Sequence, residues 1–138
     1  MKRILLFLVL VVGAQYGWQA LDHARPTSAD AVLAAAWEQR RSDVQVRGAG
    51  TVERILPDDR DGSRHQRFVL RLASGQTILV AHNIDLAPRI DALRAGDAVE
   101  FHGEYEWNAK GGVVHWTHHD PAGRHVDGWL RHDGRIYQ

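Results

Sequence analysis

From residue 44 onward, apolar side chains recur at every second position, and this period decides which class of fold the chain can adopt. In the segment 98–107, Val99, Phe101 and Tyr105 alternate with glutamates and a histidine. Since successive side chains of a strand point to opposite faces, this alternation is typical of a β-strand with one face in a core. The pattern predicts a mainly β protein.

Five strands of this kind are expected, over residues 44–56, 67–72, 77–81, 98–107 and 113–119. Gly48 and Gly50 lie inside the first strand and indicate a sharp bend, which lets that strand contribute to both sides of a closed barrel. The segment 83–97 is expected to form a short helix or turn, and Asp133-Gly134 is a typical hairpin turn.

This order of elements predicts an OB-fold-like, five-stranded Greek-key barrel. An N-terminal helix, a short helix between strands three and four, and a C-terminal hairpin would decorate it. A small open α+β sheet is the alternative. The barrel and its C-terminal extension would occupy residues 44–138, after a linker and amphipathic helix over residues 21–43. In that helix Thr27 or Ser28 can cap the N-terminus.

Residues 1–20 have the features of a signal peptide or N-terminal anchor. Lys2 and Arg3 precede an apolar run over residues 4–12, and Gly13 and Ala14 then supply small residues for cleavage after Ala14. The run is shorter than the ~20 residues that span a bilayer. The alternative is an uncleaved anchor that contacts the membrane through residues 4–18. Both interpretations predict an exported domain, either periplasmic or anchored to the inner membrane.

Composition excludes several classes of function. The chain has no cysteine, which rules out disulfides, thiolate catalysis and cysteine-ligated zinc. Basic and acidic residues are balanced at 17 each, so the charge argues against nucleic acid as a partner. The serine-hydrolase, zinc-protease and phosphate-loop motifs are missing from the sequence as well.

The segment "VVHWTHHDPAGRH" (113–125) holds four of the nine histidines. Matching apolar with apolar residues across the last two strands places Val114 and Trp116 in the core, and His115 and Thr117 on the outer face. Glu106 would share that face. The candidate ligands for a divalent metal, zinc above all, are His102, Glu104, His115, His118, His119 and Asp120.

On a straight strand His115 and His119 lie ~13 Å apart, at about 3.3 Å per residue, so both can bind one ion only if the chain turns after Thr117. Two alternatives remain for these histidines. They form a hydrogen-bonded polar clasp, or they transfer protons or sense pH, since histidine titrates near pH 6.5.

A second candidate site follows from the architecture. In an OB barrel, the loop between strands one and two and the loop between strands four and five flank the usual ligand surface. A calcium loop does not fit the first of these, because Pro57 stands at its first ligand position. The residues expected to border one binding groove are Asp59, Asp61, Arg64, His65, Trp107, Asn108 and Lys110.

The stretches "GSRHQRFVLRL", "AHNIDLAPRI", "GEYEWN" and especially "HWTHHDP" resemble a family of small exported bacterial proteins, domain of unknown function 3465. The resemblance covers residues 44–138. It implies export and no particular activity, ligand or catalytic residue.

The sequence therefore favours an exported OB-like binding module of the cell envelope, without enzymatic activity, whose partner is an unidentified small ligand or envelope component. The alternative is a metal-dependent hydrolase, of the nuclease or phosphodiesterase type, that uses the histidine-rich segment. A purely structural envelope protein is the third hypothesis.

Overall fold

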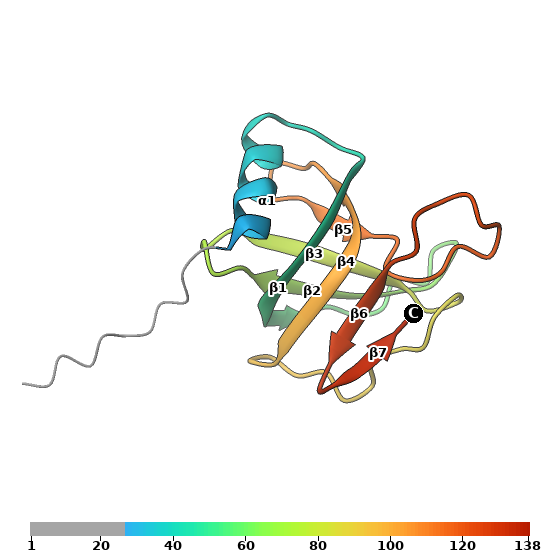
Figure 1. Cartoon of the computed structure of the whole chain (residues 1–138). Helices are drawn as coiled ribbons and strands as arrows, with labels where there is room; N and C mark the ends of the chain where they lie inside the picture. The colour runs from blue at the N-terminus through green and yellow to red at the C-terminus, as the bar shows by residue number, and fades with distance from the viewer. Residues whose placement is uncertain (1–26) are drawn as a thin grey trace, which may run out of the picture.

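The computed structural model of the chain describes residues 27–138, so the expected signal peptide or anchor and the start of the linker lie outside the described residues. Within that range one helix is followed by seven strands (Figure 1). The elements are α1 (Ser28–Glu38), β1 (Val44–Ile55), β2 (His65–Arg71), β3 (Thr77–Asn83), β4 (Ala98–Glu106), β5 (Val113–His115), β6 (Trp129–His132) and β7 (Arg135–Tyr137). Over residues 27–138, the structure has no helix with the length and apolar character needed to cross a membrane.

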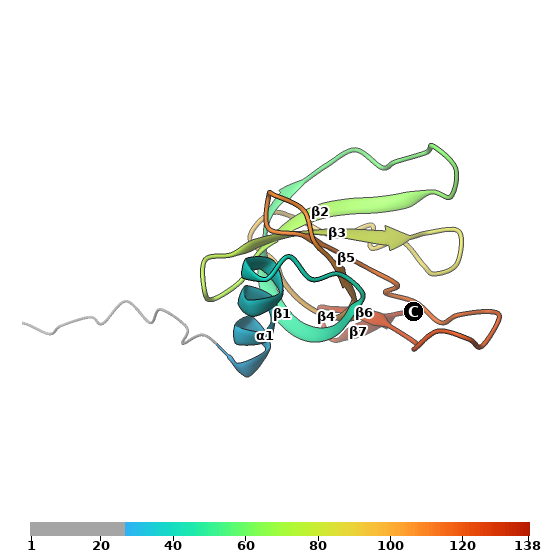
Figure 2. The same ribbon diagram turned by 90° about the horizontal axis from the view of Figure 1, so that it is seen from above.

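The first five strands close into a barrel, because β1 pairs with both β2 and β4. The antiparallel pairs β2–β3 and β4–β5 and the parallel pair β3–β5 complete the ring. Figure 2 shows β2 and β3 on one side of the molecule and β4 on the other. The expectation of an OB-fold-like barrel is confirmed.

Two glycines allow β1 to pass from one side of the barrel to the other. Thr51 pairs with β4 on one edge and with Arg71 of β2 on the other. A Cβ on Gly50 would lie 2.9 Å from the carbonyl oxygen of Arg71, and a Cβ on Gly48 would lie 2.8 Å from the ring of Phe101. The close approach therefore requires glycine, as the sequence predicted.

The helix α1 packs against one end of the barrel. Thr27 caps it, accepting a hydrogen bond from the backbone N–H of Asp30, and the Asp30 carboxylate accepts one from the backbone N–H of Thr27 (3.4 Å). Leu33 and Ala36 face the core and are fully buried. The largest fully buried side chains of the whole core are Tyr105, Phe68, Phe101, Leu33, Leu70, Ile78, Ile90 and Leu130.

The expectation of a short helix between β3 and β4 is wrong, because residues 84–97 form a series of turns. The Gln66 side chain holds Ile90 in a non-helical conformation, accepting from its N–H (2.9 Å) and donating to its C=O (2.8 Å). The carbonyl of Pro88 is likewise bound, by Nε2 of His82 at 2.9 Å. These side chains use the backbone groups that a helix would need.

The expected fifth strand is also shorter than the pattern indicated. β5 ends at His115 because the backbone of Trp116 turns into the left-handed region, with φ of +54°. The alternation stops there. Val114 is in the core as expected, whereas Trp116 is only half-buried and Thr117, expected outside, is fully buried.

The C-terminal hairpin is confirmed and has a definite position. β6 and β7 are joined by Asp133-Gly134, both with positive φ. β6 pairs with residues 99–102 of β4, on the edge that β5 occupies over residues 104–106. The hairpin thus covers the part of β4 that the short β5 leaves open.

Candidate functional site

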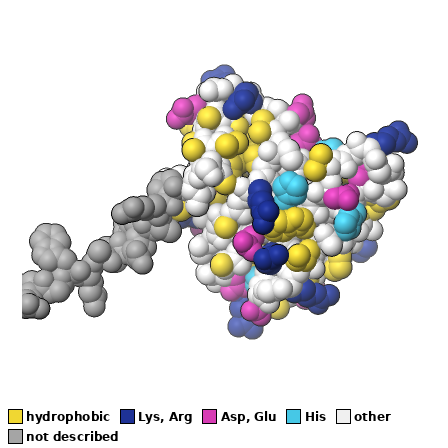
Figure 3. Space-filling view, viewed as in Figure 1, with side chains coloured by type: hydrophobic (Ala, Val, Ile, Leu, Met, Phe, Trp, Pro, Cys, Tyr) yellow, Lys and Arg dark blue, Asp and Glu magenta, His cyan; other side chains and the backbone are white. Residues whose placement is uncertain are grey.

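Two carboxylates and two imidazoles converge on the outer face of the barrel, where β4 meets β5. Glu104 and Glu106 are alternate residues of β4, and His115 of β5 is the cross-strand partner of Glu104. His125 reaches the same point from the connection between β5 and β6. We call these four residues the His–Glu cluster. Figure 3 shows surface histidines beside acidic side chains on the side where that connection projects in Figure 1.

The polar atoms of the cluster lie close together. Nε2 of His115 is 3.4 Å from Oε2 of Glu104 and 3.4 Å from Oε1 of Glu106. Nε2 of His125 is 3.2 Å from Oε2 of Glu104. The Glu104 side chain is 17% exposed and the His115 side chain 35%, so both are partly buried and within reach of solvent.

The tautomer of His125 follows from its second contact. Its Nδ1 lies 2.8 Å from the carbonyl oxygen of Val126, which can only accept a hydrogen bond. Nδ1 therefore carries a hydrogen, and Nε2 is the atom that His125 turns toward Glu104. Metal-binding histidines usually donate their other N–H to a carbonyl or carboxylate in this way.

The indole of Trp116 stacks on the imidazole of His125, with ring centroids 3.9 Å apart and planes 8° from parallel. The left-handed backbone of Trp116 costs on the order of 1–3 kcal/mol and places the ring in this position. Gly128 lets the connection return closely, because a Cβ there would lie 1.9 Å from the carbonyl oxygen of Trp116. The left-handed residue Trp116 thus lies directly beside the cluster.

Asp120 organises the connection rather than facing the cluster. Its carboxylate accepts hydrogen bonds from the backbone N–H groups of Ala122, Arg124 and His125, at 2.8 to 3.0 Å. These bonds hold the pKa of Asp120 below its usual value. Asp120, which was a candidate metal ligand, therefore stabilises the loop instead.

Three further candidate ligands also point elsewhere. Nδ1 of His118 contacts the carbonyl of His119 at 2.7 Å, and Nδ1 of His119 lies 3.0 Å from the carboxylate of Asp127. His102 sits beside the Trp129 ring, with Nε2 3.2 Å from the Gln45 amide. The structure brings Glu104 and His115 together and leaves His102, His118, His119 and Asp120 outside.

The sequence did not identify His125 as part of this site, and it placed Glu106 on the face without naming it as a ligand. His125 lies ten residues beyond the end of β5 in an irregular segment, where no period fixes the direction of a side chain. The one available signal was Asp120-Pro121 with Gly123 shortly after it, which is typical of a turn capped by a carboxylate.

A buried histidine lies beneath the connection. The carbonyl of Pro88 accepts from Nε2 of His82, so Nδ1 of the neutral ring accepts from the hydroxyl of Thr117, at 2.7 Å. Burial lowers the pKa of His82 to about 4. This ring is a neutral structural member, and it explains why Thr117 points inward.

A groove of 490 Å³ lies outside β2 and β3, bounded by the end of β1 and by the β4–β5 connection. We call it the outer groove. It is lined by Glu53, Arg54, Leu56, Arg67, Val69, Thr77, Ile78, Leu79, Asn108, Lys110 and Gly112. Of the seven residues expected to border a groove, Asn108 and Lys110 do so.

The other loop residues make local contacts. Asp59 and His65 form an isolated bridge, and the Asp59 carboxylate accepts from the N–H of Asp61 at 3.0 Å. Arg64 forms an ion pair with Asp85 at 2.7 Å, which helps to hold the pKa of Asp85 below its usual value. These four candidates border no part of the outer groove.

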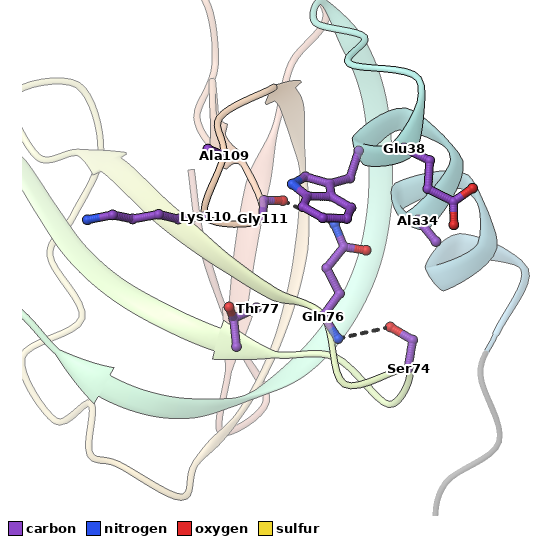
Figure 4. A pocket seen from close by; sticks show the side chains of 9 residues that line it. Ala34, Glu38, Ser74, Gln76, Thr77, Ala109, Lys110 and Gly111 are labelled. Carbon is purple, nitrogen blue, oxygen red and sulfur yellow. Dashed lines mark hydrogen bonds between the residues drawn. The ribbon is translucent and has the colours of Figure 1, made fainter.

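Trp107 fastens α1 to the barrel. Its Nε1 donates to the carbonyl of Trp37 at 3.0 Å, while Nε1 of Trp37 donates to the carbonyl of Asn108 at 3.1 Å. A cavity of 360 Å³ lies beside this contact. Figure 4 shows its lining, which includes Gln76 and Gly111. The side-chain amide of Gln76 donates to the carbonyls of Gly111 (3.1 Å) and Leu33 (3.4 Å).

Fold and site together define a small OB-like β-barrel protein with a polar cluster on one face and a groove on another. The family model described as protein of unknown function, DUF3465, matches residues 18–138. The chain therefore belongs to the DUF3465 family, as its histidine-rich segment indicated. No curated protein matches the chain.

Proposed function

We propose that the protein is an exported binding module without enzymatic activity, and that its ligand occupies the outer groove. The observation that carries this proposal is the composition of the groove, which combines an apolar floor with a positively charged rim. Leu56, Val69 and Leu79 supply the floor, and Arg54 and Lys110 supply the rim. The volume falls in the range of small-molecule sites, about 300–1,000 Å³.

The charges of the groove indicate the class of ligand. Among residues 27–138, neither Arg54 nor Lys110 forms an ion pair, whereas Glu53 is paired with Arg71. The guanidinium of Arg67 donates twice to the carbonyl of Pro57. Two cations are therefore available beside apolar side chains, which suits a small molecule with an anionic group on an apolar body. OB-fold proteins use the corresponding face for ligands, which supports the location by analogy.

The same proposal places the barrel outside the cytoplasm, on the basis of the positively charged and apolar start of the sequence. Of the six candidate metal ligands, the structure brings only Glu104 and His115 together, so we prefer the binding module to the hydrolase alternative.

An anionic, apolar probe tests the groove. 1-Anilinonaphthalene-8-sulfonate combines a sulfonate with aromatic rings, and we expect the folded protein to bind it. Lys110→Glu and Arg54→Glu should each weaken binding about tenfold, the equivalent of ~1.4 kcal/mol. In ¹⁵N–¹H spectra the probe should shift the amides of Val69 and Leu79.

Arg135→Glu is the matched control, because it makes the same charge change on β7, where the guanidinium lies over the Tyr137 ring. Affinity should be unchanged in this variant. An equal loss of affinity in the control, or shifted amides far from the groove, would show that the outer groove is not the ligand site.

A further inference from the structure

We propose that the His–Glu cluster is a binding site for a divalent transition-metal ion of the zinc type, with Glu104, Glu106, His115 and His125 as ligands. This site shares no residue with the outer groove. The two proposals can therefore be tested independently of each other.

The donor atoms of the cluster are spaced as the ligands of a zinc ion are. Zinc binds imidazole nitrogen and carboxylate oxygen at about 2.0–2.1 Å, and the edges of such a tetrahedron are about 3.4 Å long. The contacts of His115 with Glu104 and Glu106 are both 3.4 Å, and the contact of His125 with Glu104 is 3.2 Å. The donors of Glu104, Glu106 and His115 all lie within 4.8 Å of one another, and His125 joins this group of three through its contact with Glu104.

The charges of the cluster favour a bound cation. Two carboxylates lie side by side on β4, and His125, whose Nδ1 donates to Val126, turns Nε2 toward Glu104. A carboxylate oxygen and an imidazole nitrogen this close need a cation between them, either a proton or a metal ion. One divalent ion neutralises both carboxylates and accepts a lone pair from each imidazole.

The imidazole of His125 is held in position by its neighbours. The carbonyl of Val126 fixes the tautomer of His125, the Trp116 ring fixes its plane, and Asp120 binds its N–H at 2.8 Å. The left-handed backbone of Trp116 leaves its side chain half-buried beside His125. The "HWTHHD" segment thus supplies one ligand, His115, and the framework that presents another.

Metal content and affinity test the proposal. The full chain is stripped with a chelator, and zinc binding is followed by titration calorimetry and elemental analysis. We expect one zinc ion per chain. Glu104→Gln and His125→Gln should each weaken binding by about 100-fold or more, since even indirect supports of metal ligands contribute 10–100-fold. Cobalt should give the strong visible bands of tetrahedral coordination.

Matched controls separate the cluster from general surface chemistry. Glu100→Gln lies on the same strand but faces Arg131, and His119→Gln removes an imidazole that pairs with Asp127. Both should bind zinc as the wild type does. Trp116→Ala should weaken binding about tenfold, and Trp116→Phe should restore most of it, because a flat ring still stacks on His125.

Two results would contradict the zinc site. If the chelator-stripped wild type takes up no zinc, or if the control variants lose as much affinity as Glu104→Gln, the four residues form only imidazolium–carboxylate pairs and the proposal is wrong. If Glu104→Gln does not fold, as judged by circular dichroism, His115→Gln replaces it, because that side chain is more exposed.

Discussion

His82 shows how a single buried residue links folding to pH. Its folded-state pKa is lowered to about 4, chiefly because burial disfavours the charged ring, whereas the unfolded chain has the usual value near 6.5. Between these values the unfolded state binds a proton that the folded state excludes. The stabilisation is therefore complete above pH 6.5 and is lost as the pH falls toward 4.

We expect this one group to lower the free energy of unfolding by about 2 kcal/mol between pH 7.5 and pH 5, at 1.36 kcal/mol per pKa unit. Urea unfolding of His82→Gln should lack that part of the pH dependence. His102→Gln is the control, because its ring lies beside that of Trp129. Chelator in the buffer removes any contribution from bound metal. An unchanged pH dependence in His82→Gln would contradict the assignment.

Single residues also mark the limit of sequence reasoning at the candidate site. Glu104 and His115 were predicted correctly to face each other, because both lie on paired strands of known period. The positions of His118, His119 and Thr117 were not predictable, since they depend on the left-handed backbone of Trp116. A non-glycine residue in that conformation leaves no signature in the sequence.

At the level of elements, the two tryptophan hydrogen bonds decide how α1 is attached. Trp107→Phe removes the donor to the carbonyl of Trp37, and we expect it to lower the free energy of unfolding by about 1 kcal/mol. Amide hydrogen exchange in α1 should increase more than exchange in β4. Trp129→Phe is the control, since Trp129 lies over Arg47 and away from the helix. Equal exchange of α1 in both variants would contradict this role.

The predicted elements succeeded where a period governs them and failed where side chains bind the backbone. β1 through β4 and the C-terminal hairpin follow from alternation, glycine and turn residues. The segment 84–97 has a helix-like composition, yet Gln66 and His82 bind its backbone from β2 and β3. The contact of Gln66 with Ile90 joins residues 24 positions apart, and local propensity does not reveal such a contact.

For the whole molecule, the central prediction concerns export. In a Gram-negative host the chain should be recovered from the periplasm with its N-terminus at Gln15, as measured by intact mass. An uncleaved chain in the inner-membrane fraction would support the anchor alternative. Recovery of the full chain in the cytoplasmic fraction would contradict both interpretations. A variant with Lys2→Glu and Arg3→Glu should be secreted in a smaller amount.

The double pairing of β1 has a consequence for the timing of folding. The first strand is complete only after β4 has been synthesised, and the exposed edge of β4 is sealed only by β6, a few residues from the end of the chain. Such distant pairings form slowly, because the intervening chain must first be brought together. The ring of strands therefore cannot close on the growing chain before β4 and β5 have been added, and the β4 edge is covered only once β6 follows.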